Sequence, residues 1–274
     1  MLVVALFACW GYARRRTVAK DLDVSHTDLA VPLVFFTCLL GVKIVSVIIP
    51  GDADFAGELI QTHSRFRLFG LFSVGVPALF AYSRLTKLSF RGLLDLFALP
   101  MVLWLAIVRL GCFMAGCCWG DLTVEHPGLE DVTDRQLAIQ VYTLPWLSGD
   151  WILTAMSFPF DSFAYLQHDA LGLIDQGADA SLPVHPTQLY ELVLLVVLLV
   201  VLRQAENKQR IPGMTARLAI GGYAMLRFLI ELLRADKALV LGYLTSTQLI
   251  CIILILGSTA GIAILRREFA LTPF

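Results

Sequence analysis

The chain has 274 residues, of which 58% are hydrophobic and 16% are charged, and its mean hydropathy is +0.76. This composition excludes an ordinary soluble globular domain and indicates a membrane protein. The formal net charge of -1 gives no reason to expect nucleic acid as a partner, because a DNA or RNA binder needs a clustered basic face.

Seven apolar stretches are candidates to cross a hydrocarbon core of about 30 Å. The first is short, and the arginines that follow it do not fit a signal peptide, so we interpret it as an anchor or half-span. We therefore expect an all-α, polytopic integral membrane protein that forms a single membrane domain over residues 1–274. The seven stretches are 2–13, 30–50, 66–82, 93–118, 188–202, 214–234 and 243–265.

Basic residues mark every second connection between these stretches, which places those connections and the C-terminus in the cytoplasm. The segment 119–187 carries ten acidic side chains and a single arginine, Arg135. It also contains several prolines and aromatic residues, which suits a cap lying on the membrane surface. We expect this cap to be extracytoplasmic. The basic residues are Arg14, Arg15, Arg16, Lys20, Arg84, Lys87, Arg91, Arg203, Lys208, Arg210, Arg217, Arg266 and Arg267.

Ionisable side chains inside the predicted spans are functional candidates, since each one costs about 2.5–3.5 kcal/mol on insertion scales. Lys43 could snorkel to the interface or pair with a carboxylate. Arg109 lies in the outer part of the fourth stretch, before a glycine-rich exit in which a backbone or a ligand can approach closely. The exit glycines are Gly111, Gly116 and Gly120.

The sixth stretch carries a polar stripe, because its polar residues follow the period of a helix. The fifth stretch begins from the outside with His185, and Gln188 lies near the same boundary. These polar groups form either a salt-bridge network among themselves or a site for an anion, for which the phosphate of a phospholipid is the natural candidate. The stripe consists of Tyr223, Arg227, Glu231 and Arg234.

Three motifs in these regions resemble those of the prolipoprotein diacylglyceryl transferases. The motifs are RLGxFxxGxxWG over 109–120, HPTQLYE over 185–191 and YxxxRFxxExxR over 223–234. The resemblance implies a multi-pass protein of the bacterial inner (cytoplasmic) membrane. It further implies transfer of a diacylglyceryl group from phosphatidylglycerol, or a similar anionic phospholipid, to the thiol of a prolipoprotein or a related acceptor.

The resemblance also implies roles for individual residues. Arg109 and Arg227 would hold the headgroup phosphate with support from Tyr223 and Glu231. His185 could serve as a base in the catalytic set, although its usual role would be a structural one at the start of a helix. The phospholipid site would extend to Arg234, Gln188 and the three exit glycines. The histidine that the family carries in its third span is replaced here by Phe69, which cannot accept a proton.

Three cysteines, Cys112, Cys117 and Cys118, follow Arg109 closely, and two of them replace polar residues of the family pattern. They could be thiolates beside a cation, small packing residues or, for Cys112 with Cys117, a disulfide. A metal site is not expected, because no second cluster offers a fourth ligand, and no cofactor is expected. The main alternative to the enzyme is a phospholipid-binding pseudoenzyme or accessory protein, and a transporter ranks last because no inverted repeat is seen.

Overall fold

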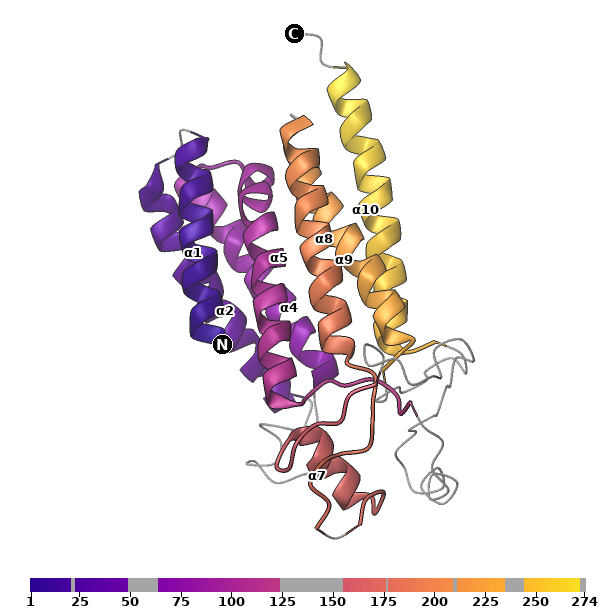
Figure 1. The fold of residues 1–274 in the computed structure, drawn as a ribbon. Coiled ribbons are helices and arrows are strands. Elements are labelled where there is room, and N and C mark those ends of the chain that lie inside the picture. Colours follow the sequence, from indigo (N-terminus) through magenta and orange to yellow (C-terminus); the bar gives the residue numbers. More distant parts are fainter. Residues whose placement is uncertain are drawn as a thin grey trace.

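The computed structural model describes residues 1–20, 23–48, 64–123, 155–175, 177–208, 211–234 and 244–271. Long helices run up and down through these residues, and one short helix lies beyond an end of the bundle (Figure 1). The long helices are α1 (Leu2–Ala19), α2 (Val24–Ile48), α4 (Ser64–Thr86), α5 (Phe90–Ala115), α8 (Thr187–Lys208), α9 (Met214–Glu231) and α10 (Ser246–Leu271), and the short one is α7 (Phe163–Ala170).

Each long helix coincides with one apolar stretch of the sequence, so the predicted all-α membrane fold is confirmed. Within the described residues, α5, α8 and α10 are long and apolar enough to cross a membrane by length and composition. At 1.5 Å of rise per residue, the 26 residues of α5 span about 39 Å. The predicted stretches differ from the helices mainly at their ends.

Three helix ends correct the sequence prediction. The first helix continues to Ala19 and includes the arginines that we placed after it. The fourth predicted stretch reached residue 118, but α5 ends at Ala115, where Gly116 adopts the left-handed conformation with φ 63°. The sixth reached residue 234, but α9 ends at Glu231, so Arg234 lies beyond the helix that we expected to carry it.

The centre of the bundle is formed by α5, α8 and α9, which pack against one another. Their contact faces present small and branched apolar side chains, including Leu99, Leu105 and Leu195. Asp95 of α5 fixes the start of α9, because its carboxylate accepts hydrogen bonds from the backbone N–H groups of Gly213 at 2.6 Å and Ala216 at 2.8 Å. This cap sets the position of α9 against α5, and so of Arg227 against Arg109.

The cap segment forms a small separate core below the bundle, around Trp119, Leu122, Phe158 and Val184. Short backbone bridges join Leu122 and Met156 to Val184. Residues 124–154 and 176 of the predicted cap lie outside the described residues. The described part includes α7, whose start is capped by the side chain of Ser162.

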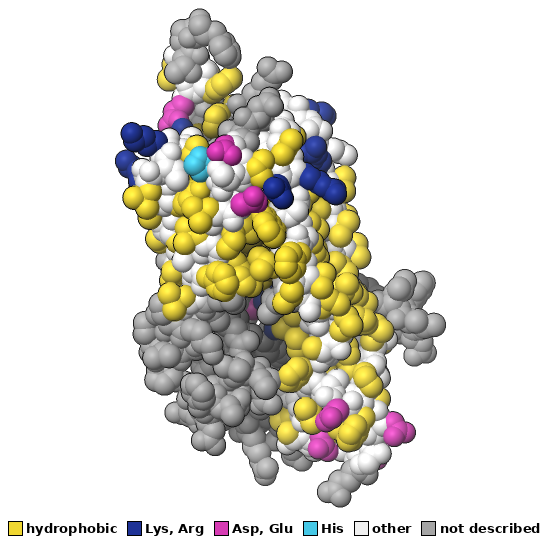
Figure 2. All heavy atoms as spheres, turned by 90° about the vertical axis from the view of Figure 1, so that its left-hand side faces the viewer, with side chains coloured by type: hydrophobic (Ala, Val, Ile, Leu, Met, Phe, Trp, Pro, Cys, Tyr) yellow, Lys and Arg dark blue, Asp and Glu magenta, His cyan; other side chains and the backbone are white. Residues whose placement is uncertain are grey.

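Charge and hydrophobicity are distributed as in a membrane protein. Figure 2 shows hydrophobic side chains over the middle of the visible face and Lys and Arg side chains gathered near the end opposite α7. Large apolar residues such as Val197 on α8 and Ile253 on α10 are 53% and 68% exposed. Such outward apolar surfaces fit a lipid environment.

Candidate active site

Arg109 and Arg227 meet at one carboxylate near the end of the bundle that carries the cap. Arg109 Nε lies 3.0 Å from Glu191 Oε2, and Arg227 Nη1 lies 3.9 Å from the same oxygen. Arg227 Nη2 also pairs with Glu231 Oε2 at 2.8 Å. The three helices α5, α8 and α9 thus each contribute a charged group to one buried network, which we call the arginine clamp.

The clamp retains positive charge. Arg234 Nε lies 4.0 Å from Glu231 Oε2, which adds a third guanidinium to the network. Three guanidinium groups against two carboxylates leave a formal charge of +1. From the sequence, Glu191 is expected on one helix face with Gln188 near the outer boundary, but we counted only the carboxylate of Glu231 against the arginines. The structure adds Glu191 as the second carboxylate.

Hydrogen-bond donors of the clamp remain available. The Nε and Nη1 atoms of Arg227 are buried and have no hydrogen-bond partner among the described residues. An arginine side chain offers five N–H donors in a planar fork that matches the oxygens of a phosphate. A buried cation with unused donors is costly unless an anion completes the site.

Neutral side chains hold the two carboxylates in place. The Tyr223 hydroxyl donates to Glu191 Oε1 over a long distance of 3.5 Å. The Thr245 hydroxyl, just before α10, donates to Glu231 Oε1 at 3.1 Å, and Gln248 in turn accepts from the Thr245 backbone N–H at 3.0 Å. Thr245 is a partner of the clamp that the sequence analysis missed.

The exit glycines lie at close backbone contacts. A side chain at Gly120 would place its Cβ 2.5 Å from the carbonyl oxygen of Leu233, and one at Gly116 would approach Ser162 to 2.8 Å. Gly111 faces Met1, just before α1, in the same way. These contacts explain the three glycines as packing positions, and their predicted role in admitting a lipid stays a prediction.

His185 and Gln188 connect the start of α8 to the segment that follows α5. His185 is 3% exposed, and its Nδ1 lies 3.4 Å from the hydroxyl of Tyr190. Its backbone carbonyl accepts from Gly120 N at 2.8 Å. The Gln188 side-chain amide donates to the Cys117 carbonyl at 2.6 Å. These contacts fit a structural role for both residues beside the clamp.

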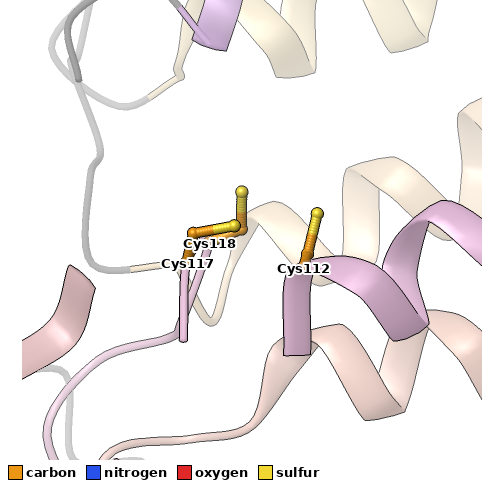
Figure 3. Close-up of side chains that lie close together, drawn as sticks. All are labelled: Cys112, Cys117 and Cys118. Carbon is orange, nitrogen blue, oxygen red and sulfur yellow. The ribbon is translucent and has the colours of Figure 1, made fainter. Parts of the chain in front are cut away.

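The thiols of Cys112, Cys117 and Cys118 come together where α5 ends (Figure 3). All three are free, so the disulfide between Cys112 and Cys117 that we considered is not formed. Hydrogen bonds from the thiols of Cys112 and Cys117, with the nearby charges of Arg234 and Arg109, hold the pKa of the Cys118 thiol well below its usual range.

Two other candidates are described only in part. Phe69 lies in α4, and Lys43 lies in α2. The side chains of both are outside the described residues. Cys9 and Cys251 are buried and free in their helices, as expected for small apolar residues.

These observations define an all-helical membrane protein with a buried, positively charged site at one end of its central helices. The family model described as prolipoprotein diacylglyceryl transferase matches residues 1–264. The chain belongs to this family.

Individual relatives agree with this assignment over most of their length. A phosphatidylglycerol–prolipoprotein diacylglyceryl transferase of Methylococcus capsulatus is 27% identical over 98% of this chain and 89% of the relative. Proteins of the same name from Xylella fastidiosa and Xanthomonas oryzae are 28% and 29% identical. The alignments cover 93% and 100% of this chain, and 83% and 88% of those relatives.

Proposed function

We propose that this chain transfers the diacylglyceryl group of phosphatidylglycerol to a cysteine thiol of a prolipoprotein. The observation that carries the proposal is the arginine clamp, with its residual positive charge and the unused N–H donors of the buried Arg227. Family membership and the names of the relatives support the same substrates.

In this reaction, the acceptor sulfur bonds to the carbon of the diacylglyceryl group that carries the phosphate. The bond between that carbon and the phosphate ester oxygen breaks. Glycerol phosphate leaves with the bonding electron pair, so negative charge grows on the phosphate oxygens. Arg109 and Arg227 would stabilise that charge, because fixed charges in a site with little water are effective without reorganisation. Glu191 would hold both guanidinium groups at the spacing that one phosphate needs.

The direct test is a transfer assay. Purified protein is incubated with phosphatidylglycerol and a peptide that contains a lipobox cysteine, and the peptide is weighed by mass spectrometry. We expect a mass increase equal to one diacylglyceryl group, and none for a peptide with serine in place of the cysteine. Phospholipid binding without any transfer would instead support the pseudoenzyme alternative.

We also propose that the clamp lies toward the outer face, with the cap outside and the C-terminus in the cytoplasm. Figure 2 supports this orientation, since Lys and Arg gather at the end away from the cap. The measurement is labelling of single cysteines introduced at exposed cap positions such as Asp169 and at Glu268 in the last turns of α10, in a background without the native cysteines. Intact cells should label the first position and not the second.

A further inference from the structure

The three clustered thiols have the arrangement of metal ligands. Their sulfur atoms all lie within 4.8 Å of one another, and each residue is partly exposed. A tetrahedral zinc ion with Zn–S bonds of about 2.3 Å needs its sulfurs about 3.8 Å apart. Side-chain rotations that move the sulfur atoms by about 1 Å are therefore enough to bring them to the spacing of zinc ligands. In Figure 3, Cys117 and Cys118 lie together on the turn, and Cys112 faces them from the last turn of α5.

The backbone that carries two of the ligands is fixed in a tight, unusual turn. Gly116 and Cys118 both have positive φ angles, of 63° and 61°. A non-glycine residue in this conformation is uncommon and costs energy, and such residues cluster at functional sites. The Cys117 and Cys118 carbonyls accept hydrogen bonds from the side chains of Gln188 at 2.6 Å and Thr187 at 2.8 Å. Two side chains of α8 thus hold the turn in place.

The surrounding charge suits a metal–thiolate complex. Three thiolates around a divalent ion leave a net charge of about -1. Arg109 and Arg234 both interact electrostatically with Cys118, so positive charge is present to offset it. Arg109 also precedes Cys112 by three residues on α5, which places the thiols next to the arginine clamp.

We propose that Cys112, Cys117 and Cys118 bind one Zn(II) ion, and that the fourth position of this ion takes the thiol of the acceptor. The second part rests on the proposed transfer reaction. Zinc with three protein ligands keeps one position for water or substrate. A thiol that coordinates zinc loses its proton, so the ion supplies a thiolate at neutral pH without a side-chain base.

In this mechanism, transfer begins when the acceptor thiol binds zinc and releases its proton to water. The sulfur then donates an electron pair to the glycerol carbon of phosphatidylglycerol. The carbon–oxygen bond to the phosphate breaks, and glycerol phosphate leaves with that bonding pair beside the clamp. The thioether product has no negative charge on sulfur, so it is a weaker ligand and dissociates from zinc.

The metal site is tested without any activity assay. Protein purified in detergent under reducing conditions is titrated with Co(II), whose thiolate complexes absorb strongly in the near ultraviolet, and with Zn(II), whose stoichiometry is measured by mass spectrometry. We expect one ion per chain and a weaker affinity, by about tenfold or more, in Cys112→Ser, Cys117→Ser and Cys118→Ser. The control Cys9→Ser changes a free cysteine outside the cluster, and this variant should bind the ion normally.

The acceptor site is tested on the Co(II) protein. A lipobox peptide should shift the cobalt spectrum, because its thiol becomes the fourth ligand, and the serine version of the peptide should not. Absence of a thiolate band, its persistence in the three cysteine variants, or a disulfide among these cysteines in protein freshly isolated without reductant would overturn the zinc site. A spectrum unchanged by the cysteine peptide would overturn the role in acceptor binding.

The transfer assay separates this inference from the proposed function. We expect chelation of zinc to lower transfer and added Zn(II) to restore it. If transfer proceeds equally in chelated and zinc-loaded protein, the reaction stands and the zinc mechanism is wrong. If the peptide shifts the cobalt spectrum but no form of the protein transfers lipid, the zinc and thiol site stands and the proposed reaction is wrong.

Discussion

Two buried carboxylates, Asp95 and Glu191, connect central helices through different partners. Asp95 binds backbone N–H groups, and Glu191 binds side chains. Each oxygen of Asp95 accepts a backbone N–H of α9, at 2.6 and 2.8 Å, so this carboxylate is fully used in fixing a helix end. Glu191 contacts only side chains in the described part of the chain, with Arg109 at 3.0 Å, Tyr223 at 3.5 Å and Arg227 at 3.9 Å.

Among the central helices, Asp95 has a structural role and Glu191 belongs to the proposed site. Asp95 stabilises a fixed arrangement that needs no further partner. Glu191 holds two guanidinium groups near each other without using all their donors, since Arg227 Nε and Nη1 have no hydrogen-bond partner among the described residues. In the proposed function, a phosphate would complete the Glu191 site, whereas both oxygens of Asp95 already accept backbone hydrogen bonds.

The largest expected effect is on stability, in Glu191→Gln. The substitution leaves Arg109 and Arg227 buried without their shared charge partner, which should lower the free energy of unfolding by about 3 kcal/mol. Added phosphatidylglycerol should recover much of this loss, because its phosphate replaces the missing negative charge. Thermal unfolding in detergent, with and without the lipid, measures both effects. If phosphatidylglycerol stabilised Asp95→Asn as much as Glu191→Gln, the difference between the two carboxylates would be refuted.

Removal of either clamp arginine should reduce transfer. A charge-assisted hydrogen bond is worth about 1.5–3 kcal/mol, so Arg109→Ala and Arg227→Ala should each lower kcat/KM by roughly 10- to 100-fold and weaken phosphatidylglycerol binding. Arg91→Ala is the matched control, since its side chain is 52% exposed and pairs with Glu268 at the surface. Unchanged lipid binding in both clamp variants would mean that the arginines are structural.

Asp95→Asn should have a smaller effect, confined to stability. An amide oxygen can still accept one N–H of α9, but the charge that favours the helix start is lost, which should cost about 1 kcal/mol. Transfer per folded molecule should stay within about twofold of the parent on the same reasoning. Unfolding temperature and kcat/KM are measured on the same preparation. A large fall in kcat/KM with little loss of stability would assign Asp95 to the reaction.

Much of the fold was predictable because membrane spans depend on the hydropathy of consecutive residues. Helix ends were less predictable. Gly116 ends α5 by adopting φ 63°, and Arg234 leaves the α9 helix to bridge with Gly120. The bridge of Arg234 depends on contacts with segments distant in the sequence, since Gly120 also binds the carbonyl of His185. A periodic pattern cannot show where tertiary contacts interrupt a helix.

The site was predictable in its residue types and less so in its pairings. Arg109, Arg227 and Glu231 were identifiable because charges inside spans are costly. The pairing of Glu191 with both arginines was not predicted, although Glu191 was placed beside Gln188 at the same boundary. Thr245 was missed, since it lies just before a helix start, where polar residues are ordinary. The three cysteines were singled out for a possible thiol role, but their grouping as metal ligands was not expected, because it requires the turn at Gly116 to fold Cys117 and Cys118 back toward Cys112.

Tyr223→Phe should have the smallest effect. The hydroxyl donates to Glu191 Oε1 at 3.5 Å, the long limit of a hydrogen bond, so its loss should cost about 0.5 kcal/mol and lower kcat/KM two- to threefold. The phenyl ring keeps the packing against the central core.

Steady-state transfer measured at varied phosphatidylglycerol concentration distinguishes two roles for Tyr223, support of Glu191 and direct contact with the phosphate. If Tyr223 only steadies Glu191, the effect stays small and KM changes little. If its hydroxyl turns to the phosphate during the reaction, kcat falls by roughly tenfold or more, as for loss of a donor to a developing negative charge. That result would place Tyr223 with the arginines as a catalytic residue, and Glu191 would then position two guanidinium groups and the phenol around one anion.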